Sequence, residues 1–289
     1  ASANGIANCV AIGANAFYGD TDTTTATDGT IAIGKDALKV LHTGQYNTAI
    51  GYHSMDEHES GRANTCLGWG TMSQSGGDVT AQDNTFIGAS SGSGDWAGAG
   101  VDQNTAVGYS TMTGAMTNAD HNSAFGAHAL QALTSGDDNT ALGAYAGAAI
   151  TTGHSNVAIG RSALLADQDG TASVVIGYEA ADGLTGSTEN TIMGYRACGN
   201  LDSTSDNLAG VVAIGSHALY GSGDTSDAAN NTIAIGRDAL KALTTGAGNI
   251  AIGYQASYSN LLGEYNTVVG YHAYYSGAPT DTNGRNTIM

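Results

Sequence analysis

The sequence predicts an all-β protein built as a parallel β-solenoid, in which short coils stack along one chain. Three observations predict this fold: glycines that recur at a regular spacing, a short alternating apolar stretch before each of them, and a composition that suits neither collagen nor disorder. The 289 residues include 43 glycines but only one proline, whereas collagen needs about one-third glycine and abundant proline. Apolar residues make up 41% of the chain, which is too many for simple disorder.

The glycines follow a repeat that covers nearly the whole chain. Fifteen short apolar stretches end in an anchor glycine, and successive anchors lie 17 to 21 residues apart, most often 17. Helical solenoid repeats are about 33 to 47 residues long, so units this short favour stacked β-coils. We expect one repeat domain over residues 1–289 with about fifteen coils. The anchors are Gly13, Gly34, Gly51, Gly68, Gly88, Gly108, Gly126, Gly143, Gly160, Gly177, Gly194, Gly215, Gly236, Gly253 and Gly270.

The residue pattern predicts the same order of secondary-structure elements in each repeat unit. An asparagine opens most units, four or five residues before the anchor, as in Asn47-Thr48-Ala49-Ile50-Gly51. Asparagine and glycine both tolerate tight turns, so they bracket a strand of about four residues whose side chains alternate between two faces. A second short strand is expected after the anchor. A Thr-Gly turn such as Thr43-Gly44 then returns the chain to the next coil.

Two columns of the repeat are expected to form the core. The residue before the anchor is apolar in every unit, and the fourth residue after the anchor is mostly bulky, as at Leu38 and Leu164. The third residue before the anchor is often threonine, as at Thr48 and Thr105. A threonine column suggests ice binding, but valine interrupts it and it shares the isoleucine face. Core or ladder packing is therefore the expected role of this column.

The second residue before the anchor is alanine in ten of the fifteen units. Such uniform smallness predicts the close approach of another chain or coil, and a continuous alanine face on a rod is expected to be an interaction surface. Closure around a threefold axis would cover it symmetrically and make a homotrimer. The alternative is a monomeric solenoid with a flat alanine surface. The predicted trimer interface contains Ala49, Ala106, Ala158 and Ala251.

The charge excludes several classes of partner. Eight Lys and Arg against 26 Asp and Glu give a net charge of −18, which is unfavourable for binding nucleic acid or anionic lipid. The sequence contains no apolar run near the roughly 20 residues that a membrane helix needs, so no membrane insertion is expected. Cys9, Cys66 and Cys198 are too few for a disulfide scaffold and are predicted to be buried thiols without catalytic duty.

The repeat units resemble two families of fibrous protein. Asn8-Cys9-Val10-Ala11-Ile12-Gly13 and Asn231-Thr232-Ile233-Ala234-Ile235-Gly236 resemble the Asn-Ser-Val-Ala-Ile-Gly signature of trimeric autotransporter adhesin heads. Asn139-Thr140-Ala141-Leu142-Gly143 and Asn104-Thr105-Ala106-Val107-Gly108-Tyr109 resemble the Asn-Thr-Ala-Ile-Gly-Tyr repeats of phage tail fibres. Both resemblances imply a left-handed parallel β-roll in which three chains form an intertwined or side-by-side homotrimer.

The resemblance implies a non-enzymatic structural and adhesive segment of a phage tail fibre. Such a segment belongs to the virion, contacts neighbouring fibre segments and attaches to a host cell-surface glycan or protein. The alternative is the head of a bacterial adhesin on the cell surface, and a third hypothesis is a polysaccharide-degrading spike. The chain begins without Met and ends in Asn286-Thr287-Ile288-Met289, one residue before the next anchor would fall. We therefore expect a fragment of a longer or processed chain.

Candidate sites are few. The segment from His53 to Glu59 has metal-ligand residue types without the spacing of zinc sites. Aspartate-rich loops could offer oxygen ligands to calcium, but their ligand order matches no calcium motif. No cofactor and no catalytic residue is predicted. Trp96 lies in the inserted loop 92–100, outside the repeat columns, and is the candidate for contact with a receptor. The aspartate-rich loops are Asp20 to Asp22, Asp137-Asp138, Asp202 to Asp206 and Asp224 to Asp227.

Overall fold

The fold is a parallel β-solenoid of about 14 turns. The computed structural model describes residues 8–19, 27–73, 80–96, 100–201, 208–221, 229–260, 263–275 and 285–289. Their regular structure consists of short strands, and nothing among these residues forms a helix that could span a membrane. The chain divides into two compact units, Ala1–Ala141 and Leu142–Met289.

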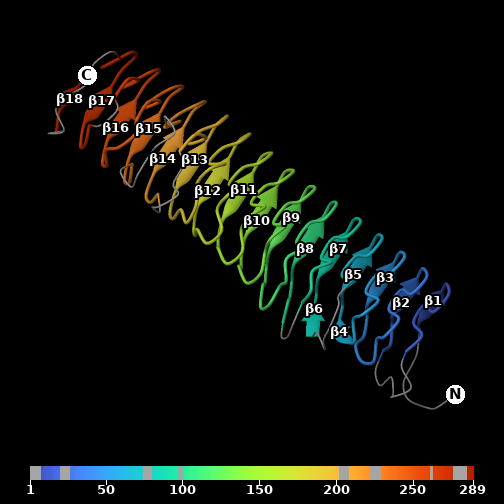
Figure 1. The fold of residues 1–289 in the computed structure, drawn as a ribbon. Helices are drawn as coiled ribbons and strands as arrows, with labels where there is room; N and C mark the ends of the chain where they lie inside the picture. Colours follow the sequence, from blue (N-terminus) through green and yellow to red (C-terminus); the bar gives the residue numbers. More distant parts are fainter. Residues whose placement is uncertain are drawn as a thin grey trace. The chain divides into compact units, whose positions relative to one another are not determined.

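The first unit contains one main sheet, in which each strand pairs in parallel with the strand of the next coil (Figure 1). The register places equivalent positions of the repeat side by side, as in the pair Ile50 and Leu67. A second, two-stranded sheet joins β4 (Ser60–Arg62) and β6 (Thr80–Gln82). The main strands are β1 (Val10–Ile12), β2 (Ile31–Ile33), β3 (Thr48–Ile50), β5 (Thr65–Leu67), β7 (Thr85–Ile87), β8 (Thr105–Val107) and β9 (Ser123–Phe125), and β10 (Thr140–Leu142) spans the division.

The second unit repeats this arrangement with the same register. Val157 of one coil pairs with Val174 of the next, and Ile159 pairs with Ile176. Like columns therefore stack on like columns, as the fixed glycine spacing requires. The strands are β11 (Val157–Ile159), β12 (Val174–Ile176), β13 (Thr191–Met193), β14 (Val212–Ile214), β15 (Ile233–Ile235), β16 (Ile250–Ile252), β17 (Thr267–Val269) and β18 (Thr287–Ile288).

The strand before each anchor is confirmed, although most of these strands have three residues instead of four. The second strand expected after the anchor does not follow it directly, because the chain turns there; among the described residues it forms only later in two coils, as β4 and β6. The second and fourth residues after the anchor have left-handed backbone, as at Asp36 (φ 60°) and Leu38 (φ 47°). Their amides still bond neighbouring coils: Asp36 N donates to Ala14 O at 2.9 Å and Leu38 N to Ser54 O at 3.0 Å. The turns therefore stack by hydrogen bonds, as the strands do.

The anchor position requires glycine for two reasons. At Gly68 and Gly108 the φ angles are +144° and +143°, a region that side chains strongly disfavour. A Cβ atom added to Gly108 would also lie 2.6 Å from the carbonyl oxygen of Gly126, the anchor of the next coil. The backbones of successive coils are therefore in direct contact at the anchors.

The core of each coil is filled from two sides by complementary volumes. The middle residue of the strand points inward, and the bulky residue four after the anchor packs from the opposite side; Ala49 and Met55 are both fully buried. In three coils a larger first position is matched by a small second one: Phe86 with Gly92, Val175 with Ala181 and Ile192 with Cys198. A Cβ atom on Gly92 would lie 2.7 Å from the Phe86 ring. The second core strip is therefore confirmed.

The prediction that the residue before the anchor belongs to the core is wrong. Ile12 is 58% exposed, Leu67 45% and Leu142 50%. Strand side chains alternate, so placing the small middle residue inside turns both of its neighbours outward. The threonine column lies on this outward side as well, with Thr65 and Thr140 exposed.

The asparagine column forms a buried ladder of amides. In the first unit, Asn64 Nδ2 donates to Asn47 Oδ1 at 3.1 Å, and Asn84 Nδ2 donates to Asn64 Oδ1 at 3.0 Å. Each carbonyl oxygen also accepts a backbone amide of the following coil, as Asn84 Oδ1 does from Asn104 N at 2.9 Å. The second unit repeats the contact between Asn249 and Asn266. The ladder satisfies polar groups that would otherwise be costly inside a thin coil.

We predict that Gly108→Ala lowers the free energy of unfolding by about 2 kcal/mol, because it combines backbone strain with a clash between coils. Gly70→Asn is the control. Gly70 also has a positive φ, but an added Cβ atom would meet no atom within 4 Å, and asparagine accepts this conformation. It should change stability by less than about 0.5 kcal/mol. Urea unfolding followed by circular dichroism measures both, and equal effects would contradict the backbone contact.

A second prediction concerns the paired core volumes. Phe86→Ala should cost about 3 kcal/mol by leaving a cavity. Adding Gly92→Leu restores the commoner small-and-large pattern and should recover about 1–2 kcal/mol, because it refills that cavity. Gly92→Leu alone should destabilise the protein, because it collides with the Phe86 ring. Additive effects in this double-mutant cycle would show that the two positions do not share space.

Candidate functional site

The widest candidate surface of each unit is the outward side of its main sheet, which we call the apolar face. It contains the third and the first residue before each anchor, and none of these residues is charged. The members in the first unit are Val10, Ile12, Ile31, Ile33, Thr48, Ile50, Thr65, Leu67, Thr85, Ile87, Thr105, Val107, Ser123, Phe125 and Thr140. In the second they are Leu142, Val157, Ile159, Val174, Ile176, Thr191, Met193, Val212, Ile214, Ile233, Ile235, Ile250, Ile252, Thr267 and Val269.

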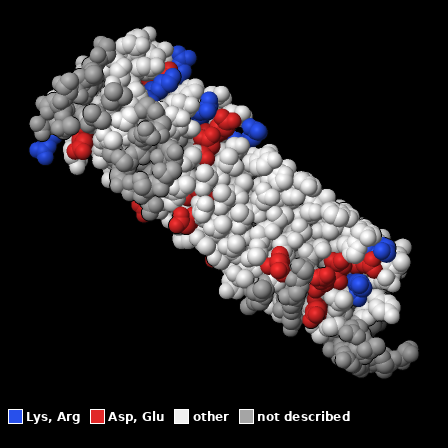
Figure 2. Space-filling view, viewed as in Figure 1, with Lys and Arg blue, Asp and Glu red and all other residues white. Residues whose placement is uncertain are grey.

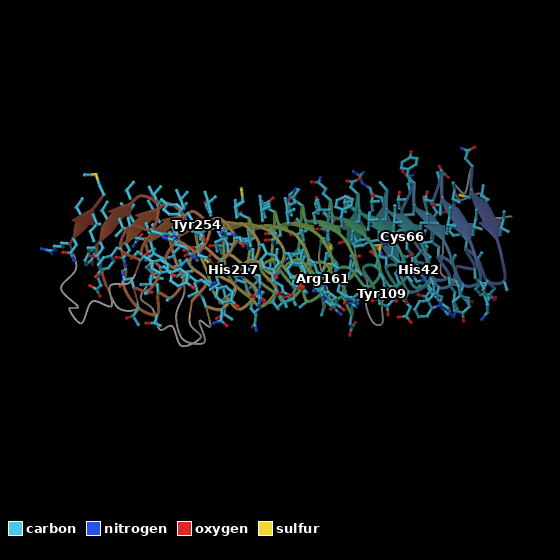
Figure 3. All side chains as sticks on the ribbon, turned by 90° about the horizontal axis from the view of Figure 1, so that it is seen from above. His42, Cys66, Tyr109, Arg161, His217 and Tyr254 are labelled. Atoms are coloured by element: carbon cyan, nitrogen blue, oxygen red, sulfur yellow. The ribbon has the colours of Figure 1, made fainter. Side chains whose placement is uncertain are left out.

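The apolar face is open to solvent in the single chain. Phe125 is 41% exposed, Met193 41% and Ile252 38%, and Figure 3 shows side chains standing off the strands of both units. Figure 2 shows one side of the molecule, on which Asp and Glu gather in a few places and large areas carry no charge. Extended apolar patches on a protein surface mark contacts with partners, and depletion of charge is typical of interface cores.

The predicted trimer-interface alanines are not on a surface. Ala49, Ala106 and Ala251 are 0% exposed and Ala158 is 1% exposed within the single chain. The prediction is wrong because the small side chain matches a bulky residue across the same coil and not a neighbouring chain. In the coil of Ala158, for example, Leu164 fills the opposite side.

The prediction that Trp96 contacts a receptor is also wrong. It is 0% exposed, and its ring lies 5.6 Å from the ring of Phe86. The residue lies outside the repeat columns but still adds to the core. It therefore cannot act as an exposed receptor contact.

The turns after the anchors carry a second kind of surface, made of aromatic rings and cations. In three pairs of successive coils, the residue directly after the anchor is a cation in the first coil and a tyrosine in the second, and the cation lies over the ring. Lys35 Nζ is 5.2 Å from the Tyr52 ring centroid, and the guanidinium carbon of Arg237 is 4.6 Å from that of Tyr254. The pattern of Lys or Arg after one anchor and Tyr after the next is visible in the aligned repeat units, but no prediction was based on it.

Carboxylates beside these cations complete the turn surface. Asp36 pairs with Lys35 at 3.2 Å and accepts a hydrogen bond from Asn15 Nδ2 at 2.8 Å. The Asn15 bond and the Lys35 pair hold the pKa of Asp36 below its usual value. The pKa of Lys35 is raised by the same pair. Both groups therefore remain charged at neutral pH, which gives the turns local pairs of opposite charge.

The predicted metal candidates do not converge. In the segment from His53 to Glu59, His53 Nδ1 bonds Asp56 while His58 is buried in the core. Among the residues that the structure describes, no group of three or more His, Cys, Asp and Glu is arranged to hold a metal ion.

The one described aspartate-rich loop has a structural role. Asp137 Oδ1 accepts Asp120 N at 2.8 Å, and Asp120 Oδ1 accepts Asp102 N at 2.8 Å. The carboxylates thus bind backbone amides of the preceding coil. The loops at Asp20 to Asp22, Asp202 to Asp206 and Asp224 to Asp227 lie outside the described residues.

The three cysteines are free thiols. Cys66 and Cys198 are fully buried, which confirms their predicted placement, and burial raises the pKa of both thiols. Cys9 is only partly buried, and its thiol bonds Thr27 O at 3.2 Å. A raised pKa removes the thiolate that nucleophilic chemistry needs, so Cys66 and Cys198 are unreactive core residues.

No protein-family model matches this sequence, and no curated protein matches it either. A stacked solenoid serves many functions, so the fold alone does not name one. The function is therefore inferred from the chemistry of the apolar face and of the turns.

Proposed function

We propose that the chain is a non-enzymatic structural and adhesive segment of a phage tail fibre, in which three copies pack through their apolar faces. The observation that carries the proposal is the absence of charge over every coil of a solvent-open face, which consists mainly of aliphatic residues and threonines. The turns, where the charged and aromatic residues gather, remain outside the assembly and contact the host. The segment belongs to the virion and joins neighbouring fibre segments.

A second and a third copy of the chain are the best occupants of the apolar face. The face repeats with the same spacing as the coils, so only a partner with the same repeat matches it along its length. Threefold closure covers three such faces at once and leaves none open. The repeat resemblance supports the same assembly and a left-handed coil. The proposed interface contains the residues that directly precede the anchors, such as Ile50, Leu67 and Phe125.

The head of a bacterial trimeric adhesin is the second candidate. The units Asn8 to Gly13 and Asn231 to Gly236 favour it, because they match the adhesin signature more closely than the shorter Asn-Thr-Ala-Ile-Gly form. The same face would form the trimer in both cases. The two proposals therefore differ in location, on a virion or on a cell surface, and not in architecture.

We predict that light scattering of the intact protein gives a mass three times the 28.9 kDa of one chain. The double variant Leu67→Glu/Phe125→Glu should dissociate to monomers and keep its far-ultraviolet circular dichroism, because both side chains face away from the coil interior. Tyr109→Glu is the control, since Tyr109 is more exposed, at 57%, but lies in a turn; it should stay trimeric. Ala158→Glu should instead unfold the coil, because it buries a charge.

A wild-type mass near 28.9 kDa would contradict the trimer. Inhibition of ice growth by such a monomer would assign the exposed threonine columns to ice binding.

We predict that immunogold labelling of the source culture with antibodies against this chain decorates phage particles. Labelling of bacterial surfaces in the absence of phage would favour the adhesin. The purified trimer should bind intact cells of a susceptible strain without releasing reducing sugars from their polysaccharide. Sugar release would contradict the non-enzymatic proposal, because it would identify a polysaccharide-degrading spike.

A further inference from the structure

A groove crosses three successive coils of the first unit along the two-stranded sheet of β4 and β6. Its volume is about 260 Å³, near the lower end of the range of about 300–1,000 Å³ that is typical of small-molecule sites. Hydroxyl, amide and guanidinium groups line the groove, and no Asp or Glu does. The polar lining residues are Thr43, Ser60, Arg62, Thr80 and Gln82.

The parallel register brings these polar side chains together. β4 and β6 pair Ser60 with Thr80, and a bridge places Thr43 beside Ser60. In the same register, Arg62 pairs with Gln82. The middle residue of β6 is fully buried, so its two neighbours on the strand point outward. The groove therefore presents a row of three hydroxyls beside a guanidinium and an amide.

The groove belongs to a different sheet from the apolar face. β4 and β6 form their own sheet and lie apart from the main strands of the unit (Figure 1). The proposed trimer contact therefore does not use the groove. Gly44 and Gly61 complete the lining with backbone atoms, and a Cβ atom on Gly44 would collide with Gly61 O. Neither position has a side chain that projects into the groove.

Arg62 brings an unpaired positive charge to the groove. Its side chain is exposed, and no carboxylate of the described residues forms an ion pair with it. Most other cations of the chain do pair with a carboxylate, so the guanidinium of Arg62 stands out as available to a ligand. The paired cations are Lys35, Arg161, Arg196, Arg237 and Lys241.

Three further side chains of the groove have unused hydrogen-bonding capacity. Within the described part of the chain, the side chains of Thr43, Thr80 and Gln82 form no hydrogen bond. A hydroxyl both donates and accepts, and the amide offers a carbonyl oxygen and an NH2 group. Thr43 and Thr80 are exposed, so a ligand can reach their hydroxyls from solvent.

A carboxylate one coil beyond Gln82 gives the groove an electrostatic direction. Asp102 is bridged to Gln82, and its Oδ1 atom accepts the Gln82 backbone amide at 2.8 Å. Two coil spacings, about 10 Å, separate the positions of Arg62 and Asp102 along this ladder. A negative group of a ligand is therefore favoured at Arg62 and repelled from the side of Asp102.

We infer that this groove binds a hexuronic acid unit, flanked by neutral sugars, of a bacterial surface polysaccharide. The inference rests on the proposed attachment function and names its receptor class. The planar guanidinium of Arg62 matches a carboxylate with two parallel hydrogen bonds, and the hydroxyl row and the Gln82 amide bond the ring hydroxyls. One guanidinium supplies one positive charge, and the net charge of −18 disfavours a densely charged polyanion.

The test applies the intact protein, at about 0.15 M salt, to an array of purified capsular polysaccharides that contain uronic acids. Each polysaccharide is printed beside a copy whose carboxyl groups have been reduced to alcohols. The wild type should bind at least one of the acidic polysaccharides and should bind its reduced copy about tenfold or more weakly, because the reduced copy lacks the charge-assisted contact.

Arg62→Gln should weaken binding to the acidic polysaccharide about tenfold or more, because it removes the same contact from the protein. Thr80→Val removes one hydroxyl with little change of shape and should weaken it about threefold. Lys39→Gln is the matched control. Lys39 is an exposed cation of the same unit, has no ion-pair partner among the described residues and does not line the groove.

Light scattering and circular dichroism check that each variant keeps the assembly and fold of the wild type. Weaker binding by both groove variants but not by the control supports the inference. Equal binding by Arg62→Gln and Lys39→Gln would overturn the groove, and undiminished binding to the reduced copies would overturn the acidic class of ligand. Failure of the wild type to bind any of these polysaccharides would overturn the inference as a whole, whereas the immunogold result decides the fibre proposal independently.

Discussion

Hydrogen bonding between successive coils, parallel and in register, is the constraint on which the rest of this structure depends. A coil of about 17 residues has too little interior to satisfy its own backbone, so almost every strand and turn amide bonds the coil before or after it. The coils must then approach to strand spacing at every position, including the anchors, where Gly108 faces the backbone of Gly126. A side chain at that point would separate the coils. The glycine content is therefore a condition of stacking and not a sign of flexibility.

The same register places chemically identical residues above one another, and the molecule uses this in several ways. Inside each unit, a stacked asparagine donates an amide hydrogen bond to the asparagine of the preceding coil, as Asn84 does to Asn64. In the turns, a cation of one coil lies over the tyrosine of the next, as Arg237 does over Tyr254. Like charges in one column would repel, and a ring in the coil after each cation, as Tyr52 follows Lys35, avoids this repulsion.

The thinness of the coil also explains why its bulky aliphatic residues lie outside. Each coil encloses room for only a few large side chains, such as Leu38 and Leu41 of one coil, and the strand contributes one of them at Phe86. The remaining large residues of the strand, such as Ile12 and Leu67, have no space inside and form the apolar face. A fold that satisfies its hydrogen bonds within one chain therefore still exposes an apolar surface to a partner. Its fold and its proposed assembly arise from the same shortage of interior volume.

The sequence by itself determined the repeat, the strand before each anchor, the parallel stacking and the inward bulky residue at Leu38, because periodic glycine and asparagine allow few other backbones. It also determined that neighbouring strand residues face opposite sides. Only the tertiary structure decided which side is inside: Ala49 is buried and Leu67 is exposed because Met55 and its equivalents already occupy the interior. Hydrophobicity favoured the opposite assignment. For Trp96 the error came from its position outside the repeat columns, since the residue nevertheless packs on Phe86. Alternation is a local property of the backbone, whereas the choice of face depends on volume shared across a coil.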